Sequence, residues 1–318
     1  MNTQIWKVMA LMFMLFAITP VAATEETLQT ATPTPQPTVE VKREKIDSQA
    51  LAGNLLGDPT ERTVYVLLPP GYATSDKRYP VVYVTPGGLG EPSGPAFKFE
   101  MFMKSLLGKG EIKEMIVVVP DGTDKLGFSF FMSSSTIGDY ETYLTQEVVG
   151  YVDTHYRTLP TSDSRGITGC SRGGTASMRL GFRYPTVFSV VASGAGEWDY
   201  SLDVWPSDLE TVQRLKQLPR IISDFSPFGI GWYVEMAAAT APDPNNPPFY
   251  CEMPFRIVDG RGEFVQRSLP GSLKPTLPTK RAGIYSSRSD CEAFSFGMGC
   301  MMPTFRCRFT VSYTCLPT

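Results

Sequence analysis

The sequence has 318 residues, of which 42% are hydrophobic and 19% charged, and its formal net charge is −3. These values are ordinary for a folded globular protein, and the length allows one large α/β domain with a sizeable core. They exclude a nucleic-acid-binding protein with a basic stripe, and they give no reason to expect an acidic polymer as a partner.

Residues 1–23 have the features of a secretory signal peptide. Lys7 precedes an apolar run over residues 8–18, and residues 21–23 (V-A-A) supply small side chains for cleavage. The apolar run is too short to predict a membrane span, although a retained N-terminal anchor stays open as an alternative. We therefore expect a secreted protein, or one of the periplasm or cell envelope, with no stable membrane span after cleavage.

The rest of the chain divides by composition into three parts. Residues 24–45 begin with a Thr/Pro-rich stretch that lacks periodicity, so we expect a linker there. Residues 46–260 have the pattern of a folded domain with an aromatic-rich insertion at about 199–250. That insertion is interpreted as a cap over a binding pocket, with plain packing as the alternative. Residues 261–318 form an atypical tail rich in Cys, Ser and Pro.

Short apolar runs alternate with segments of helical periodicity inside the domain. Strands are expected at residues 62–68, 80–84, 115–119 and 187–192. Helices are expected around the apolar positions of residues 99–107, from about Asp139 to Val152, and over residues 175–184. Strands that alternate with helices pair in parallel through right-handed crossovers. The expected fold class is therefore α/β, with a doubly wound, mostly parallel sheet.

The chemistry of the chain is concentrated in residues 165–174, which read R-G-I-T-G-C-S-R-G-G. A β-prone run ends in G-x-S-x-G and a helix-compatible segment follows, which is the context of a nucleophile elbow. Ser171 is the predicted nucleophile, with a structural glycine turn as the alternative. The backbone N–H of Arg172 would lie at a helix N-terminus, where it can face a developing oxyanion. Cys170 is not expected to act, because the elbow presents its central residue to the substrate.

Several spaced motifs between residues 47 and 260 resemble a known family. They are N-L-L-G at 54–57, L-P-P-G-Y at 68–72, R-Y-P-V at 78–81, Y-R-T at 156–158 and G-C-S-R-G-G at 169–174. Together they resemble landmarks of the esterase D-like esterases of the α/β-hydrolase fold. That family includes S-formylglutathione hydrolases, feruloyl esterases, enterochelin esterases and mycolyltransferases.

The resemblance implies a serine carboxylesterase or acyltransferase with Ser, Asp and His in that chain order and with no metal or cofactor. The substrate would be a small-molecule or carbohydrate-linked ester. The family's second oxyanion donor corresponds to the backbone N–H of Gly88 in the glycine loop at residues 85–90. This chain has Pro86 where many members have histidine. A tight turn without a ligand is the alternative for Gly87 and Gly88.

Four further residues match the family pattern, and we interpret them as structural: Glu147, Asp153, Tyr156 and Arg157.

The expected histidine is missing. The only one in the chain, His155, precedes Ser171 and falls near the end of the helix leading into the elbow strand, about 15–20 Å from the serine. It continues the apolar spacing of that helix, so we expect a packing residue and not the catalytic base. Asp290 is the only late aspartate that could act as the triad acid.

The tail departs from the family pattern where the last strands and helices should follow. Acidic residues become rare after residue 260, and five of the six cysteines lie at Cys251 or beyond. A change of reading frame near Gly260 is the simplest explanation, which would leave the C-terminal part of the fold incomplete or aberrant. A divergent tail and a disulfide-linked module are the alternatives. The sequence therefore predicts a secreted serine esterase that is impaired as written. A non-catalytic acyl-ligand-binding protein and a mycolyltransferase-like acyltransferase stay open.

Overall fold

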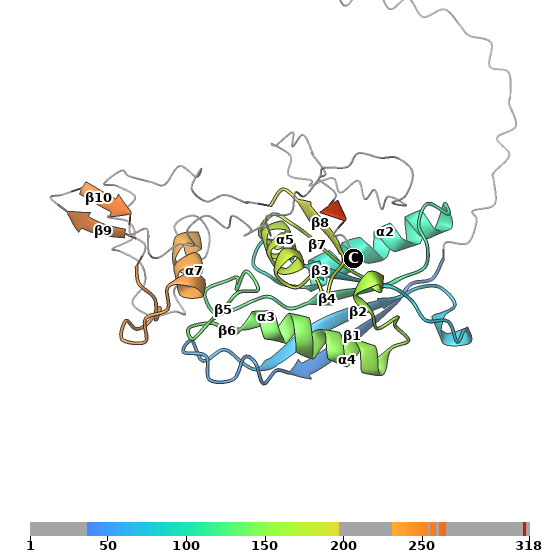
Figure 1. The fold of residues 1–318 in the computed structure, drawn as a ribbon, viewed down its shortest axis with the longest axis horizontal. Coiled ribbons are helices and arrows are strands. Elements are labelled where there is room, and N and C mark those ends of the chain that lie inside the picture. The colour runs from blue at the N-terminus through green and yellow to red at the C-terminus, as the bar shows by residue number, and fades with distance from the viewer. Residues whose placement is uncertain (1–36, 197–230, 254, 259–260, 265–313, 316–318) are drawn as a thin grey trace, which may run out of the picture. The chain divides into compact units, whose positions relative to one another are not determined.

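The computed structural model describes residues 37–196, 231–253, 255–258, 261–264 and 314–315 (Figure 1). Its main feature is a seven-stranded sheet in the order β1-β2-β4-β3-β7-β8-β11. The strands are β1 (Glu40–Asp47), β2 (Glu61–Leu68), β3 (Val81–Thr85), β4 (Ile116–Pro120), β7 (Arg165–Cys170), β8 (Val190–Gly194) and β11 (Thr314–Cys315). Shorter elements lie between them, namely η1 (Tyr72–Thr74), β5 (Ser133–Ser134), β6 (Gly138–Asp139) and η3 (Ser162–Ser164).

The centre of the sheet is parallel and its margins are antiparallel. β4, β3, β7 and β8 pair in parallel, whereas β1 with β2, β2 with β4 and β8 with β11 pair antiparallel. The chain passes from β3 to β4 on one side and then to β7 on the other side of β3, so the winding reverses at β3. The register pairs Thr85 with Gly169, which brings the carboxyl ends of β3 and β7 together. The doubly wound sheet agrees with the α/β-hydrolase fold class predicted from the sequence.

An apolar core covers each face of the sheet, and β4 contributes to both. Ile116 and Val118 belong to one core and Val117 and Val119 to the other, as a continuous apolar run in a central strand requires. The helix α2 (Ser93–Gly108) covers the second core (Figure 1). It does so with its buried residues Ala96, Phe99 and Met103.

Two helical segments cover the opposite face. The first is a continuous run of α3 (Tyr140–Thr142), the π-helical η2 (Tyr143–Val148) and α4 (Val149–His155). Asp139 caps it, because its carboxylate accepts a hydrogen bond of 3.0 Å from the N–H of Thr142. The second segment is α5 (Arg172–Arg183), which follows the predicted elbow. The expected helix from Asp139 is therefore confirmed.

Two sequence predictions need correction. Residues 40–45, predicted as linker, belong to β1, which pairs along its whole length with β2. Most side chains of this strand are charged and exposed, as is common for an edge strand. The sequence therefore contains no apolar run that would predict a strand here. The strand expected at 187–192 is β8 and begins only at Val190. The N–H of Val187 instead donates to the carbonyl of Tyr184, in the turn after α5.

Only part of the insertion and of the tail is described. Within the insertion, α7 (Gly231–Thr240) buries Val234 and Met236 in the first core, and Ser134 donates to the carbonyl of Ala238 over 2.7 Å. The strands β9 (Phe255–Val258) and β10 (Arg261–Phe264) form an antiparallel hairpin. The predicted signal peptide, residues 199–230 and most of the tail lie outside the described residues. Within the described ranges, no helix has both the length and the hydrophobicity that a bilayer span requires.

Candidate active site

Ser171 lies in the turn between β7 and α5. Its φ of 56° and ψ of −128° are outside the regions that non-glycine residues ordinarily adopt. Its N–H donates to the carbonyl of Gly194 over 2.8 Å, and its carbonyl accepts from the N–H of Thr175 over 3.0 Å. These bonds hold the strained conformation while the residue itself remains exposed. The sharp strand-to-helix turn expected from the sequence is present, and the nucleophilic role of Ser171 stays a prediction.

The glycines of the motif leave no room for a side chain. A Cβ on Gly169 would lie 2.5 Å from Oγ1 of Thr85. A Cβ on Gly173 would lie 2.6 Å from the carbonyl oxygen of Pro86 and would also collide with that of Thr85. Thr85 in turn donates its hydroxyl to the carbonyl of Gly173 over 2.7 Å. The backbones of β3, β7 and α5 therefore touch at the elbow, which explains the small residues on both sides of Ser171.

The glycine loop after β3 lies directly against this turn. A Cβ on Gly87 would be 3.7 Å from the Cβ of Ser171 and would collide with the carbonyl of Cys170. Gly88 has a φ of +61°, which glycine adopts at little cost. The N–H of Gly90 closes the loop on the carbonyl of Gly87 over 3.1 Å. The structure thus brings together the loop and the serine that the sequence singled out. The role of the Gly88 N–H as an oxyanion donor remains a prediction.

Arg172 joins these two segments to α7. Its backbone N–H belongs to the first residue of α5, where a helix carries partial positive charge. Its guanidinium donates to Oε2 of Glu235 over 2.6 Å and to the carbonyl of Gly88 over 3.3 Å. The guanidinium carbon also lies 5.6 Å from the centroid of the Phe130 ring. The sequence suggested a backbone role for Arg172 but not these side-chain contacts.

Glu235 is a buried acid that the sequence did not single out. Burial raises the pKa of this carboxyl, and the positive charge of Arg172 opposes the shift. Glu235 is the only charged residue in α7, whose sequence is G-W-Y-V-E-M-A-A-A-T. The sequence did carry one signal for Glu235, which is a single carboxyl in an otherwise apolar helix. Such a group is rarely buried unless it has a partner.

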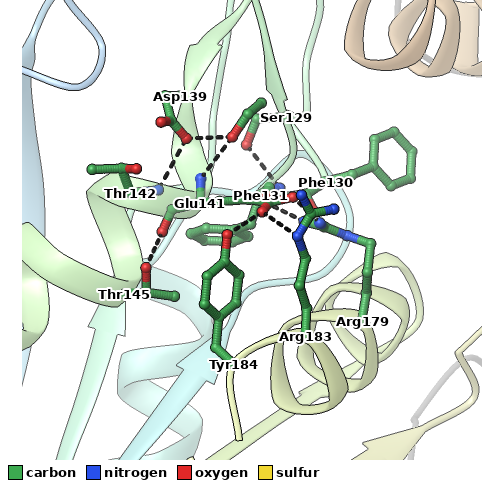
Figure 2. A network of polar contacts seen from close by, with 11 residues as sticks. Ser129, Phe130, Phe131, Asp139, Glu141, Thr142, Thr145, Arg179, Arg183 and Tyr184 are labelled. Atoms are coloured by element: carbon green, nitrogen blue, oxygen red, sulfur yellow. Dashed lines mark hydrogen bonds and ion pairs between the residues drawn. The ribbon is translucent and has the colours of Figure 1, made fainter. Parts of the chain in front are cut away.

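A network of polar contacts joins α5 to the chain at Phe130 and Phe131 (Figure 2). Phe130 and Phe131 have φ values of 53° and 49°, which is unusual for residues other than glycine. Arg179 of α5 donates to both of their carbonyls and forms an ion pair with the buried Glu141. The elbow helix therefore holds the strained corner in place, and the ring of Phe130 is fixed beside Arg172.

Asp124 is another buried acid, and its charge acts on Glu235. Its Oδ1 accepts from the N–H groups of Leu126 and Gly127 over 2.9 and 2.8 Å. Its Oδ2 has no hydrogen-bond partner within the described part of the chain. Burial, reinforced by the negative charge of Asp58, raises the pKa of Asp124 to about 7. The ionised form of Asp124 thus destabilises the folded state.

The variant Asp124→Asn is expected to be more stable than the wild type at neutral pH. Between pH 3.8 and about 7 the folded wild type keeps a proton that the unfolded chain releases, so its stability falls as the pH rises through this window. The amide keeps an acceptor for both N–H groups and does not ionise. Its advantage should be small near pH 4 and grow to the order of 1–4 kcal/mol above pH 7. Urea unfolding at a series of pH values measures it.

The variant Asp139→Asn provides a control of opposite sign. Burial raises the pKa of Asp139, but hydrogen bonds from Ser133 and Thr142 outweigh burial and lower the pKa overall. The wild-type carboxylate therefore stabilises the fold at neutral pH, and this contribution is lost as the pH falls through its folded pKa. If Asp124→Asn showed the same pH dependence as Asp139→Asn, the assigned direction for Asp124 would be wrong.

His155 is located away from the elbow. It ends α4, and the N–H of Tyr79, just before β3, donates to the carbonyl of Arg157. The end of α4 is therefore near the start of the parallel strands, whereas Ser171 follows their carboxyl ends. The imidazole is exposed and stacks on Tyr151 with ring centroids 3.9 Å apart. The expectation that His155 packs on the apolar face is wrong, because the helix ends there and leaves the ring at the surface.

The other candidate residues are structural or lie outside the described residues. Glu147 accepts a hydrogen bond from the N–H of Ala50, and Asp153 forms an ion pair with Arg165. Tyr156 donates its hydroxyl to Glu44, and the guanidinium of Arg157 lies over the ring of Tyr72. Cys170 is half-buried at the end of β7. Asp290, the candidate triad acid, lies outside the described residues, as do Cys291, Cys300 and Cys307. Cys251 is a buried thiol, and burial raises its pKa to about 12.

Comparison with known proteins gives related esterases. An esterase of Mycobacterium tuberculosis is 27% identical over 225 residues, which cover 64% of this chain and 48% of that protein. An endo-1,4-beta-xylanase/feruloyl esterase of Xylanibacter ruminicola is 31% identical over 134 residues, which cover 40% of this chain and 18% of that protein. The chain thus spans about half the length of the mycobacterial relative that it matches.

Solved structures with detectable likeness include two hydrolases. A ferulic acid esterase from Anaeromyces mucronatus has 21% sequence identity and a TM-score of 0.40, covering 55% of this chain and 63% of that chain. An S-formylglutathione hydrolase from Staphylococcus aureus has 15% identity and a TM-score of 0.40, covering 59% of this chain and 71% of that chain.

The family assignment comes from a family model described as "Putative esterase". It matches residues 58–221, which is more than half of the chain. This range includes the glycine loop, the elbow and the strands β2 to β8 that position them. The strand order and the sharp turn at Ser171 agree with the α/β-hydrolase fold expected from the resemblance. The chain belongs to this esterase family of the α/β-hydrolase fold.

Proposed function

We propose that the chain contains a serine carboxylesterase domain that acts on a small-molecule or carbohydrate-linked ester. One observation carries the proposal: Ser171 is exposed in a strained turn, with the Gly87–Gly88 loop directly against it. A serine held in this way is placed to attack a carbonyl carbon whose oxygen lies between the loop and the start of α5.

The reaction would proceed through an acyl-enzyme. Oγ of Ser171 adds to the ester carbonyl, and the negative charge that develops on the carbonyl oxygen is held by the N–H groups of Gly88 and Arg172. Collapse of this intermediate expels the alcohol and leaves the acyl group on Ser171. Water then attacks the acyl carbon and releases the acid.

Both steps need a base that accepts a proton from serine or water, which is ordinarily a histidine. The 318 residues contain only His155, which is located near the opposite ends of the strands from Ser171. We therefore propose that this polypeptide keeps the nucleophile and the oxyanion site but turns over slowly. A reading-frame change near Gly260 would explain the loss of the histidine.

Export from the cytoplasm is part of the proposal. The apolar run and small residues of 1–23 support a cleaved signal peptide, and the product would be secreted or retained in the periplasm or cell envelope. A second function, binding of an acylated ligand without turnover, is favoured by the position of His155. Acyl transfer is the third, in which an acceptor hydroxyl replaces water in the last step.

Labelling with a fluorophosphonate tests the proposal. Because no histidine lies beside Ser171 to activate it, the probe is expected to form a covalent adduct there only slowly, during prolonged incubation. Mass spectrometry locates the adduct, and Ser171→Ala should give none. The variant Ser164→Ala, in the surface turn η3, is the matched control and should be labelled like the wild type. A folded wild type that binds an acylated ligand but is never labelled would contradict the esterase proposal and support the binding function.

A further inference from the structure

We propose that Glu235 is a positioning residue that fixes the candidate oxyanion site through Arg172. The inference extends the proposed function, because it concerns how Gly88 and Arg172 are held beside Ser171. It starts from one side chain, since the guanidinium of Arg172 contacts the glycine loop and α7 at the same time.

Arg172 contributes to the restraint of the glycine loop. Within the described part of the chain, no atom outside residues 87–89 lies within 4 Å of the position that a Cβ on Gly88 would take. The loop is closed by the bond from Gly90 to Gly87, which leaves the Gly88 carbonyl available to Arg172. The 3.3 Å bond from Arg172 is thus a direct connection between the loop and the elbow helix.

Arg172 is in turn restrained by Glu235. Its guanidinium forms a 2.6 Å ion pair with the carboxylate of Glu235, a fully buried side chain of α7. Oε1 of Glu235 has no hydrogen-bond partner within the described part of the chain, so the carboxyl is directed to Arg172 through Oε2 alone. A buried carboxyl in an apolar helix is costly to keep, and an apolar residue would pack there equally well. The pair is therefore better explained by orientation of Arg172 than by stability.

The ion pair connects α7 to the elbow. The helix α7 belongs to the insertion at 199–250, and its Glu235 pairs with the first residue of the elbow helix. The ring of Phe130 borders the same guanidinium, so Arg172 is held by an ion pair and an aromatic face together. Release of Glu235 should therefore loosen the glycine loop as well as α7.

Hydrogen exchange in the full chain tests this coupling. Glu235→Leu keeps the apolar packing of α7 but removes the acceptor, and the backbone amides among residues 85–92 (all but Pro86 and Pro92) are expected to exchange about tenfold faster than in the wild type. Glu235→Gln keeps an acceptor oxygen for Arg172 and should retain most of the protection. Arg172→Met removes the same contacts from the other partner and should also accelerate exchange of the loop. It therefore serves as the test if Glu235→Leu does not fold.

The matched control is Asp153→Asn, which breaks a similarly buried ion pair with Arg165 at the opposite end of β7. It should leave exchange in residues 85–92 unchanged. The proposal would be overturned if the glycine loop of Glu235→Leu exchanged at the wild-type rate. It would also be overturned if Asp153→Asn accelerated exchange of the loop as much as Glu235→Leu does. The readout does not depend on turnover, so an unlabelled Ser171 would reject the esterase function without deciding the role of Glu235.

Discussion

Hydrolysis of p-nitrophenyl acetate by the 318-residue chain is expected to be up to ~10⁶-fold slower than by a histidine-containing member of the family. The reason is that a histidine ordinarily serves as the base, and the single histidine of the sequence, His155, is exposed at the end of α4. In serine hydrolases that lack a triad member, the oxyanion hole and substrate binding leave a residual acceleration of ~10³–10⁴ over water. Steady-state kinetics with the purified chain measures the rate.

Added imidazole separates a missing base from a damaged site. If the nucleophile and oxyanion donors are intact, imidazole should accelerate the wild type more than Ser171→Ala, which reports the reaction of imidazole with the ester in solution. Turnover of about 10 s⁻¹ without imidazole, a typical enzymatic value, would contradict the prediction. It would mean that another residue of this chain supplies the base.

The variant Gly173→Ala is expected to lose ~3 kcal/mol or more of its free energy of unfolding. The new Cβ would collide with the carbonyls of Thr85 and Pro86, and these are backbone atoms that cannot rotate away as a side chain does. Accommodation requires β3 and α5 to separate at the elbow. Urea unfolding measures the loss, and fluorophosphonate labelling of Ser171 should disappear with it.

The control for this variant is Gly150→Ala. A Cβ on Gly150 in α4 would point into open space, and alanine is the better helix former. This change should be neutral or stabilise the protein by about 0.5–1 kcal/mol. Equal stability of Gly173→Ala and the wild type would show that β3 and the elbow helix are not in direct backbone contact.

The sequence predicted most of the central sheet because local composition reports burial directly. The apolar run of β4 is buried on both faces, and the G-x-S-x-G spacing reflects backbone contacts at Gly169 and Gly173. β1 was missed for the opposite reason. An edge strand with charged side chains has the composition of a linker, and only its pairing with β2 identifies it as a strand.

The candidate site was only half predictable. Ser171 and the glycine loop are marked by local motifs, whereas the pairing of Arg172 with Glu235 joins residues 63 positions apart. No single-sequence pattern specifies such a partner. The strained backbone at Phe130 and Phe131 was hidden as well, because tertiary bonds from Arg179 stabilise a conformation that these residues would not adopt by themselves.

The exposed stacking of His155 on Tyr151 makes this chain convenient for spectroscopy. Because the sequence has a single histidine, the ring C–H signals of its imidazole in a proton NMR spectrum need neither isotope labelling nor mutagenesis for assignment. The ring current of Tyr151, 3.9 Å away, should displace those signals from their random-coil positions only while α4 is folded. One resolved signal of the purified chain would thus report whether α4 has folded, without any substrate.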